Sequence, residues 1–188
     1  NTVKWNISSS VFNSLTGSIQ QAWNFTKALD SSLNDIRIVT GKSADEMDRF
    51  AVKANAAAKE LGATTKDYTN ASLIFAQQGL SDKEIEAKTN VTLKVANVTG
   101  QDAAAVSEQL TAVWNGYKVS AEEAEIYADR LAAVASKSAS NLQELATGMS
   151  KVASAAATMG VSEEQLAAQL STIISVTRQA PESVGVAL

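Results

Sequence analysis

The sequence contains no cysteine and no histidine among its 188 residues. Without cysteine, neither a disulfide framework nor thiol chemistry is available. Without histidine, the chain lacks the side chain that most often serves as a general base or as a metal ligand. An enzyme that degrades the cell envelope is therefore the least favoured class of function, and we expect no catalytic, cofactor or metal site.

Proline, aromatic residues and long apolar runs are also scarce. Pro181 is the only proline, and aromatic residues make up 5% of the chain. Because proline interrupts helices, its near absence favours helices, packed closely through small side chains. No apolar run reaches the ~18 residues of a membrane-spanning helix, and the first residues lack the apolar region of a signal peptide. The net charge of −4 argues against a nucleic-acid-binding surface.

Glycine and serine mark regular interruptions along the chain. Glycines stand at positions 41, 62, 79, 100, 116 and 160, and the segment 138–141 is a further break. The motif S-x-x-E/Q follows five breaks, starting at Ser43, Ser81, Ser120, Ser140 and Ser162. In this capping box the first and fourth side chains satisfy backbone amides at a helix start. We expect Thr64 or Thr65, and Asp102, to cap the two remaining helices.

Between the interruptions, apolar residues recur every three or four positions, which indicates amphipathic helices. The segment 68–84, YTNASLIFAQQGLSDKE, encodes a helix, a turn and a second helix, and most of the chain repeats this pattern. The segment 82–98 is apolar on two sides and is predicted to be the most buried helix.

The predicted fold class is all-α, with a long N-terminal helix followed by a bundle of about seven short helices joined by Gly/Ser turns. A solenoid of helix pairs is the alternative, because the turns GLSDKE, GYKVSAEE and GVSEEQ recur. The unequal helix lengths favour the bundle. We expect an N-terminal helix at 1–40, a helical core domain at 41–180 and the start of a further helix at 181–188.

The N-terminal segment shows the three-four spacing of a coiled coil, which predicts a possible self-association seam. An ordinary amphipathic helix that packs on the following domain fits the spacing equally well. The seam residues are Phe12, Leu15, Ile19, Ala22, Leu29, Leu33 and Ile36. Because the chain begins without methionine and stops soon after Pro181 opens a helix, we expect it to be an excerpt of a longer chain.

Two local patterns invite a chemical interpretation. The acidic cluster consists of Glu122, Glu123, Glu125 and Asp129. These residues fall in the first turns of a predicted helix, where negative charge favours the helix dipole, so we interpret them as structural. The segment GKS at 41–43 lacks the upstream glycine and the strand of a P-loop. Trp114 is predicted to be a packing anchor.

Several segments together resemble the core region of phage tail tape measure proteins. They include LNDIRIVTGKSADEMDRFAVKANAAAKELGATTKDYTNASLIFAQQGLSDKE, LTAVWNGYKVSAEEAEIYADRLA, SNLQELATGMSKVASAAATMGVSEEQLAAQLSTI and TRQAPESVGVAL. The resemblance covers about residues 25–188, and the order and spacing of the motifs make it specific.

The resemblance implies a structural, multicopy virion protein that lies in the lumen of the tail tube, sets tail length and leaves ahead of the DNA. Implied partners are copies of itself, tail tube, tail-tip and tail chaperone proteins, with host-envelope contact through other parts of the chain. During assembly the location would be the host cytoplasm. The alternative is a stand-alone helical adaptor or secreted effector that binds a partner protein through an amphipathic groove.

Overall fold

The computed structural model describes residues 27–188, which fold into helices and connecting turns without any strand. The helices span residues 27–40, then α2 (Ala44–Glu60), α3 (Thr65–Gln77), α4 (Asp82–Thr99), α5 (Ala103–Tyr117), α6 (Ala124–Ser136), α7 (Leu142–Thr158), α8 (Glu163–Thr177) and α9 (Pro181–Ala187). The predicted all-α class is confirmed. The division into 1–40, 41–180 and 181–188 stays a prediction.

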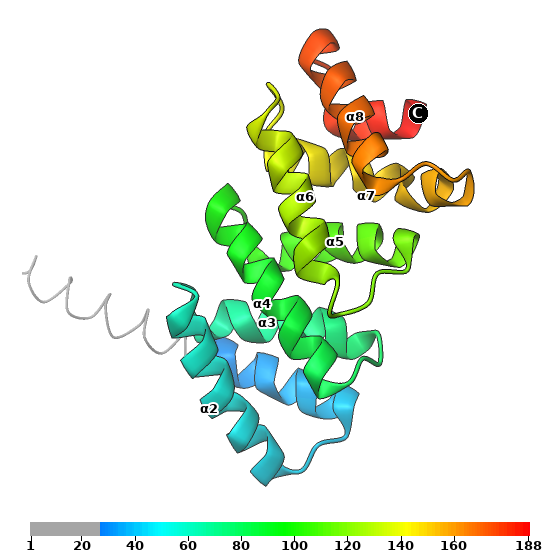
Figure 1. Cartoon of the computed structure of the whole chain (residues 1–188). Helices are drawn as coiled ribbons and strands as arrows, with labels where there is room; N and C mark the ends of the chain where they lie inside the picture. The colour runs from blue at the N-terminus through cyan, green and yellow to red at the C-terminus, as the bar shows by residue number, and fades with distance from the viewer. Residues whose placement is uncertain (1–26) are drawn as a thin grey trace, which may run out of the picture.

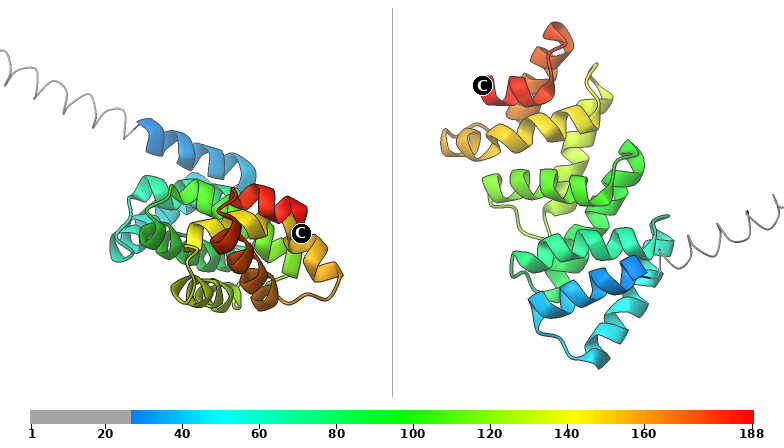
Figure 2. Two further views of the ribbon diagram at one scale, coloured as in Figure 1. Left: turned by 90° about the horizontal axis from the view of Figure 1, so that it is seen from above. Right: turned by 180° about the vertical axis from the view of Figure 1, so that it is seen from behind.

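The helices form an elongated stack of two layers (Figure 1). One layer holds helix 27–40 and the odd-numbered helices, and the other holds the even-numbered helices. Within the layers, α3 contacts α5, α5 contacts α7 and α7 contacts α9, while α4 contacts α6 and α6 contacts α8. The view from behind in Figure 2 shows the same progression from one end of the stack to the other.

The expected bundle of about seven short helices after a long N-terminal helix is not confirmed, because the main contacts join helices that are close in sequence. Helix 27–40 and the odd-numbered helices α3, α5 and α7 are each joined to the next even-numbered helix by a turn that contains a serine. In Figure 1 these four turns lie along one edge of the stack, on the right. Each turn therefore joins the two helices of one pair, and the pairs stack as in a solenoid.

Capping boxes fix most of the helix starts, as the sequence predicts. Ser43, Thr64, Ser81 and Ser162 are N-caps whose boxes close with the residue three positions on, and Asp102 accepts from Ala104 and Ala105 amides. Each such cap stabilises its helix by about 1 kcal/mol.

Two predicted starts are shifted along the chain. The N-cap of α7 is Asn141 with Glu144, instead of Ser140 with Gln143, and Ser140 is buried and bonds the Ser171 carbonyl. The Ser120–Glu123 bonds form, but residues 121–123 make a turn before α6 begins.

The core is one continuous cluster along the stack, rich in alanine. Trp114 is 1% exposed and its ring centroid lies 6.0 Å from that of Phe75, so the packing role predicted for this residue is confirmed. The prediction that α4 is apolar on two sides needs a correction at Val98, which is 78% exposed at the end of the helix. The eight buried residues of α4 are matched by eight in α7.

Glycine has two different roles in this stack. Gly79 lies in the turn that follows α3 and adopts φ +73°, a backbone conformation that other residues adopt only at an energetic cost. Gly116 was expected to mark a turn, but it lies inside α5, and a Cβ placed there would sit 2.8 Å from the Ser154 amide nitrogen of α7. The residue that ends α5 is Lys118, at φ 56°. Gly116 therefore permits a close helix contact.

Candidate functional site

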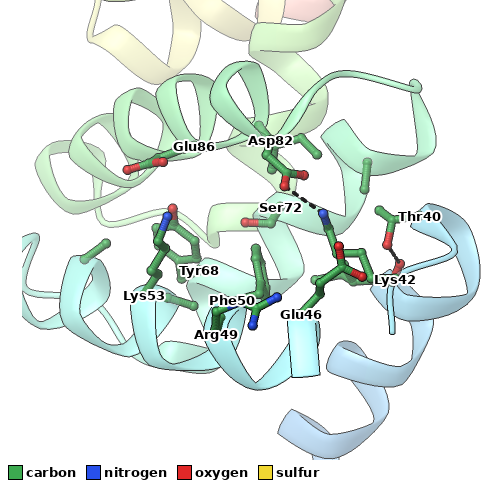
Figure 3. Close-up of a pocket in the computed structure, with 15 residues that line it drawn as sticks. Thr40, Lys42, Glu46, Arg49, Phe50, Lys53, Tyr68, Ser72, Asp82 and Glu86 are labelled. Carbon is green, nitrogen blue, oxygen red and sulfur yellow. Dashed lines mark hydrogen bonds and ion pairs between the residues drawn. The ribbon is translucent and has the colours of Figure 1, made fainter. Parts of the chain in front are cut away.

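A cavity of about 260 Å³ lies at the N-terminal end of the stack, between helix 27–40, α2, α3 and α4 (Figure 3). We call it the N-terminal groove. Its apolar wall includes Phe50, Tyr68 and Ile85, and Arg49 and Lys53 are among the charged residues that also line it. At this volume the N-terminal groove is slightly smaller than the ~300–1,000 Å³ that is usual for small-molecule pockets.

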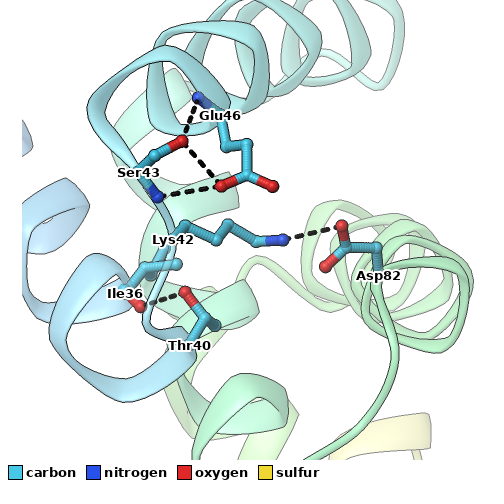
Figure 4. A network of polar contacts seen from close by, with 6 residues as sticks. All are labelled: Ile36, Thr40, Lys42, Ser43, Glu46 and Asp82. Carbon is cyan, nitrogen blue, oxygen red and sulfur yellow. Dashed lines mark hydrogen bonds and ion pairs between the residues drawn. The ribbon is translucent and has the colours of Figure 1, made fainter.

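A polar network holds one side of this groove in place (Figure 4). Lys42 donates to Asp82 at 2.7 Å, which ties the turn before α2 to the first turn of α4. The Lys42 side chain is 17% exposed and that of Asp82 is 73% exposed, so we expect this pair to contribute at most about 1 kcal/mol. The Ser43 hydroxyl and amide both donate to Glu46, and these bonds lower the pKa of Glu46.

The interior of the N-terminal groove carries few polar groups. Tyr68 is buried, and burial raises the pKa of its hydroxyl to about 12. Ser72 and Thr89 are buried and share a hydrogen bond of 3.2 Å. Among the residues that line this groove, Tyr68 and Ser72 therefore offer hydrogen-bonding hydroxyls and no activated nucleophile.

A second cavity, of about 620 Å³, lies on the edge of the stack that carries the four serine-containing turns. We call it the turn-edge cavity. It is lined by Gly116, Tyr117, Lys118, Tyr127, Arg130, Ala157, Thr158, Gly160, Val161, Ser162, Glu163 and Glu164. The end of α5, the middle of α6 and the α7–α8 turn thus meet there, so the cavity joins two successive helix pairs.

Aromatic and charged groups line the turn-edge cavity side by side. The Tyr117 and Tyr127 ring centroids are 6.3 Å apart, and the Arg130 guanidinium lies 5.5 Å from the Tyr127 centroid. Arg130 Nε also pairs with Glu164 at 3.2 Å. Glu163 is 4% exposed; burial raises its pKa to about 7, while Arg130 opposes this shift and Glu164 adds to it.

The predicted self-association seam is described only in part. Phe12, Leu15, Ile19 and Ala22 lie outside the described residues. Leu29 and Leu33 are half-buried, and Ile36 is 1% exposed and lines the N-terminal groove. Helix 27–40 also packs on α3, since Ser32 donates to Asn70 at 2.7 Å. Self-association through the seam stays a prediction.

The predicted acidic cluster is distributed over separate structural contacts. Glu123 accepts from the Ser120 hydroxyl and amide, and Glu125 pairs with Lys94 of α4. Glu122 and Asp129 are exposed. Within residues 27–188, no group of three or more acidic side chains is placed to hold a metal ion.

The sequence interpretation missed Glu163 and Tyr117 as site residues. Glu163 was assigned to a capped first turn, where exposed acids are common. A signal was present, because Glu163 stands four and seven residues before Ala167 and Leu170, on the apolar stripe of α8. An acidic residue in phase with an apolar stripe is expected to be buried.

A two-layer helical stack with cavities between successive helix pairs is typical of proteins that bind other macromolecules along an extended surface. Residues 53–188, more than half of the chain, match the sequence profile of the family described as phage-related minor tail protein. The chain therefore belongs to that family. Its role is accordingly that of a structural component of the phage tail and the virion, in contact with other tail components.

Neither the curated protein sequences nor the solved structures include a match to this chain. None of the helices within residues 27–188 combines the length and the apolar character that crossing a lipid bilayer requires.

Proposed function

We propose that this chain is a core segment of a phage tail tape measure protein. In this role it lies in the lumen of the tail tube, sets the length of the tail during assembly and leaves the tube as DNA is ejected. The function is structural and requires no catalytic residue, cofactor or metal. Membership of the minor tail protein family over residues 53–188 is the observation that carries the proposal.

The arrangement of the helices supports a length-setting role. The helix pairs stack in one direction, so each added pair lengthens the molecule by a fixed amount. The motif order from GKS to TRQAPESVGVAL, which resembles tape measure proteins, spans the same stack. Proposed partners are tail tube, tail-tip and tail chaperone proteins and other copies of this chain, first in the host cytoplasm and then in the virion.

A change in chain length within the phage tests this function. Deleting the 39 residues from Gly79 to Tyr117, so that Lys118 takes the place of Gly79 in the turn, removes one helix from each layer. The expected result is a shorter tail in electron micrographs. The tail should be shorter by about 10 Å if the stack is retained in the tube, and by about 58 Å if the segment is extended into a single helix.

Duplicating the same residues serves as the matched variant, and it should lengthen the tail by the same amount. The exposed substitution Glu108→Gln is the control and should leave tail length unchanged. If assembled tails keep their wild-type length in the duplication variant, the chain does not measure length and the proposal fails.

A further inference from the structure

The turn-edge cavity contains two buried oxygen atoms that its own residues leave without a partner. Glu163 Oε2 and Tyr117 Oη are both inaccessible, and neither has a hydrogen-bond partner among the described residues. Burying a polar atom without such a partner is costly, so each such atom requires an explanation, of which a bound group is one.

The charged groups around the turn-edge cavity do not include a cation that pairs with Glu163 among the described residues. Arg130, on α6, pairs with Glu164 and lies over the Tyr127 ring. Lys118, which follows α5, is exposed. The α7–α8 turn contributes only uncharged lining residues. The titratable residues that line the cavity are Tyr117, Lys118, Tyr127, Arg130, Glu163 and Glu164. Glu163 is thus a buried acid with no cation within ion-pair distance among the described residues.

We propose that the turn-edge cavity binds the guanidinium group of an arginine side chain from a partner protein. Glu163 supplies the carboxylate that pairs with the guanidinium, and Tyr117 supplies the ring on which it stacks. This inference does not depend on the tape measure role.

The chemistry of guanidinium fits the cavity better than that of a lysine ammonium. Guanidinium is planar, weakly hydrated and able to donate two parallel hydrogen bonds to one carboxylate while its face lies on an aromatic ring. An ammonium group is compact and strongly hydrated, so it loses more on entering a largely buried site. The cavity of about 620 Å³ has room for such a side chain.

The full chain can be titrated with a minimal probe, N-acetyl-arginine methylamide, while ¹³C resonances of the glutamate and tyrosine side chains are followed by NMR at pH 8. The isosteric uncharged probe, N-acetyl-citrulline methylamide, is the control ligand. We expect saturable shifts at Glu163 and Tyr117, with at least tenfold tighter binding of the arginine probe.

Two variants assign the effect to this cavity. Glu163→Gln should weaken binding of the arginine probe at least tenfold, whereas Glu108→Gln removes an exposed carboxylate from α5 and should change nothing. Binding should also be roughly tenfold weaker at pH 6 than at pH 8, because Glu163, with its pKa near 7, must be ionised to pair.

Equal binding of both probes, or no saturable shift at Glu163, overturns the proposal. The proposal is also overturned if the pKa of Glu163 is near 4.5 in the unsubstituted chain and is higher in Arg130→Gln, because Arg130 would then already occupy the site. If Glu163→Gln fails to fold, the pH dependence of the unsubstituted chain decides the question. None of these outcomes depends on tail length, so this site and the tape measure role can fail separately.

Discussion

Substitution of Gly116 tests the most extensive helix contact of the stack, that between α5 and α7. An alanine Cβ at this position would lie 2.8 Å from the Ser154 nitrogen and 2.9 Å from the Ala153 carbonyl carbon. Both are backbone atoms, so no side-chain rotation can relieve the overlap. Overpacking of this kind costs about 1–3 kcal/mol, and we place this site near the upper end.

Helix propensity acts in the opposite direction. Alanine is better than glycine inside a helix by about 0.5–1 kcal/mol. We therefore expect Gly116→Ala to lower the free energy of unfolding by about 2 kcal/mol, measured by urea denaturation with a two-state fit. Ala105→Gly, on the exposed side of α5, is the control for propensity and should cost about 1 kcal/mol.

A Gly116→Ala variant as stable as the unsubstituted chain, or more stable, would refute this reasoning. Propensity alone would then decide the outcome, and α5 and α7 could not approach as closely as described.

Three further substitutions test buried contacts. Burial raises the pKa of Glu163 from 4.5 to about 7, so the native state holds the proton more tightly and stability falls as pH rises through this range. The loss of stability between pH 5 and pH 8, measured by denaturation, should therefore be about 2–3 kcal/mol smaller in Glu163→Gln than in the unsubstituted chain. Lys88 is 6% exposed, its ammonium nitrogen lies 5.3 Å from the Trp114 ring centroid, and burial lowers its pKa. At pH 7 the free energy of unfolding of Lys88→Met should lie within about 1 kcal/mol of that of the unsubstituted chain. A larger loss of stability would show that the charge of Lys88 is needed. Gly185→Ala would push its Cβ into the Gly148 backbone, so limited proteolysis should cut near α9 while the rest resists; unchanged cleavage would contradict that contact.

The local structure could be predicted from the sequence because its signals are short-range. A capping box requires only a serine or threonine and an acceptor three residues later, and Ser43, Thr64, Ser81 and Ser162 act as predicted. Pro181 opens α9 at its first position because its fixed φ suits a helix start. At residues 140–141, adjacent Ser and Asn are both good caps, and tertiary burial of Ser140 decides between them.

The arrangement of the helices could not be predicted in the same way. An apolar stripe shows that a helix face is buried but does not name the helix that covers it. In α7 the buried set runs from Leu142 to Ala156, and it serves contacts with α5, α6, α8 and α9. Bundles and stacks both require such faces. The recurring turn motif was the better indicator, because similar turns along one edge place successive pairs in equivalent positions.

The candidate site depended on similar long-range information. The sequence identified the glutamates at the helix starts, and the one signal that separates Glu163 from Glu164 is its phase with the apolar stripe of α8. Only the packing of the α7–α8 turn against Tyr117 and Arg130 shows that one carboxyl is buried and the other is paired at the surface.

Stacking also predicts how the chain opens. Stability in a stack is approximately a sum over neighbouring contacts, so the ends can unfold without the centre. Helix α9 has seven residues and contacts mainly α7 and α8, whereas α5 is packed between α3, α4 and α7. We expect native-state hydrogen exchange to give a lower opening free energy for amides in α8 and α9 than for those in α4 and α5. Exchange of all helices at one common free energy would show a single cooperative unit. An end that opens first is the behaviour expected for the proposed tape measure role, because packing into a tube and leaving it would then disrupt one helix pair at a time instead of the whole core.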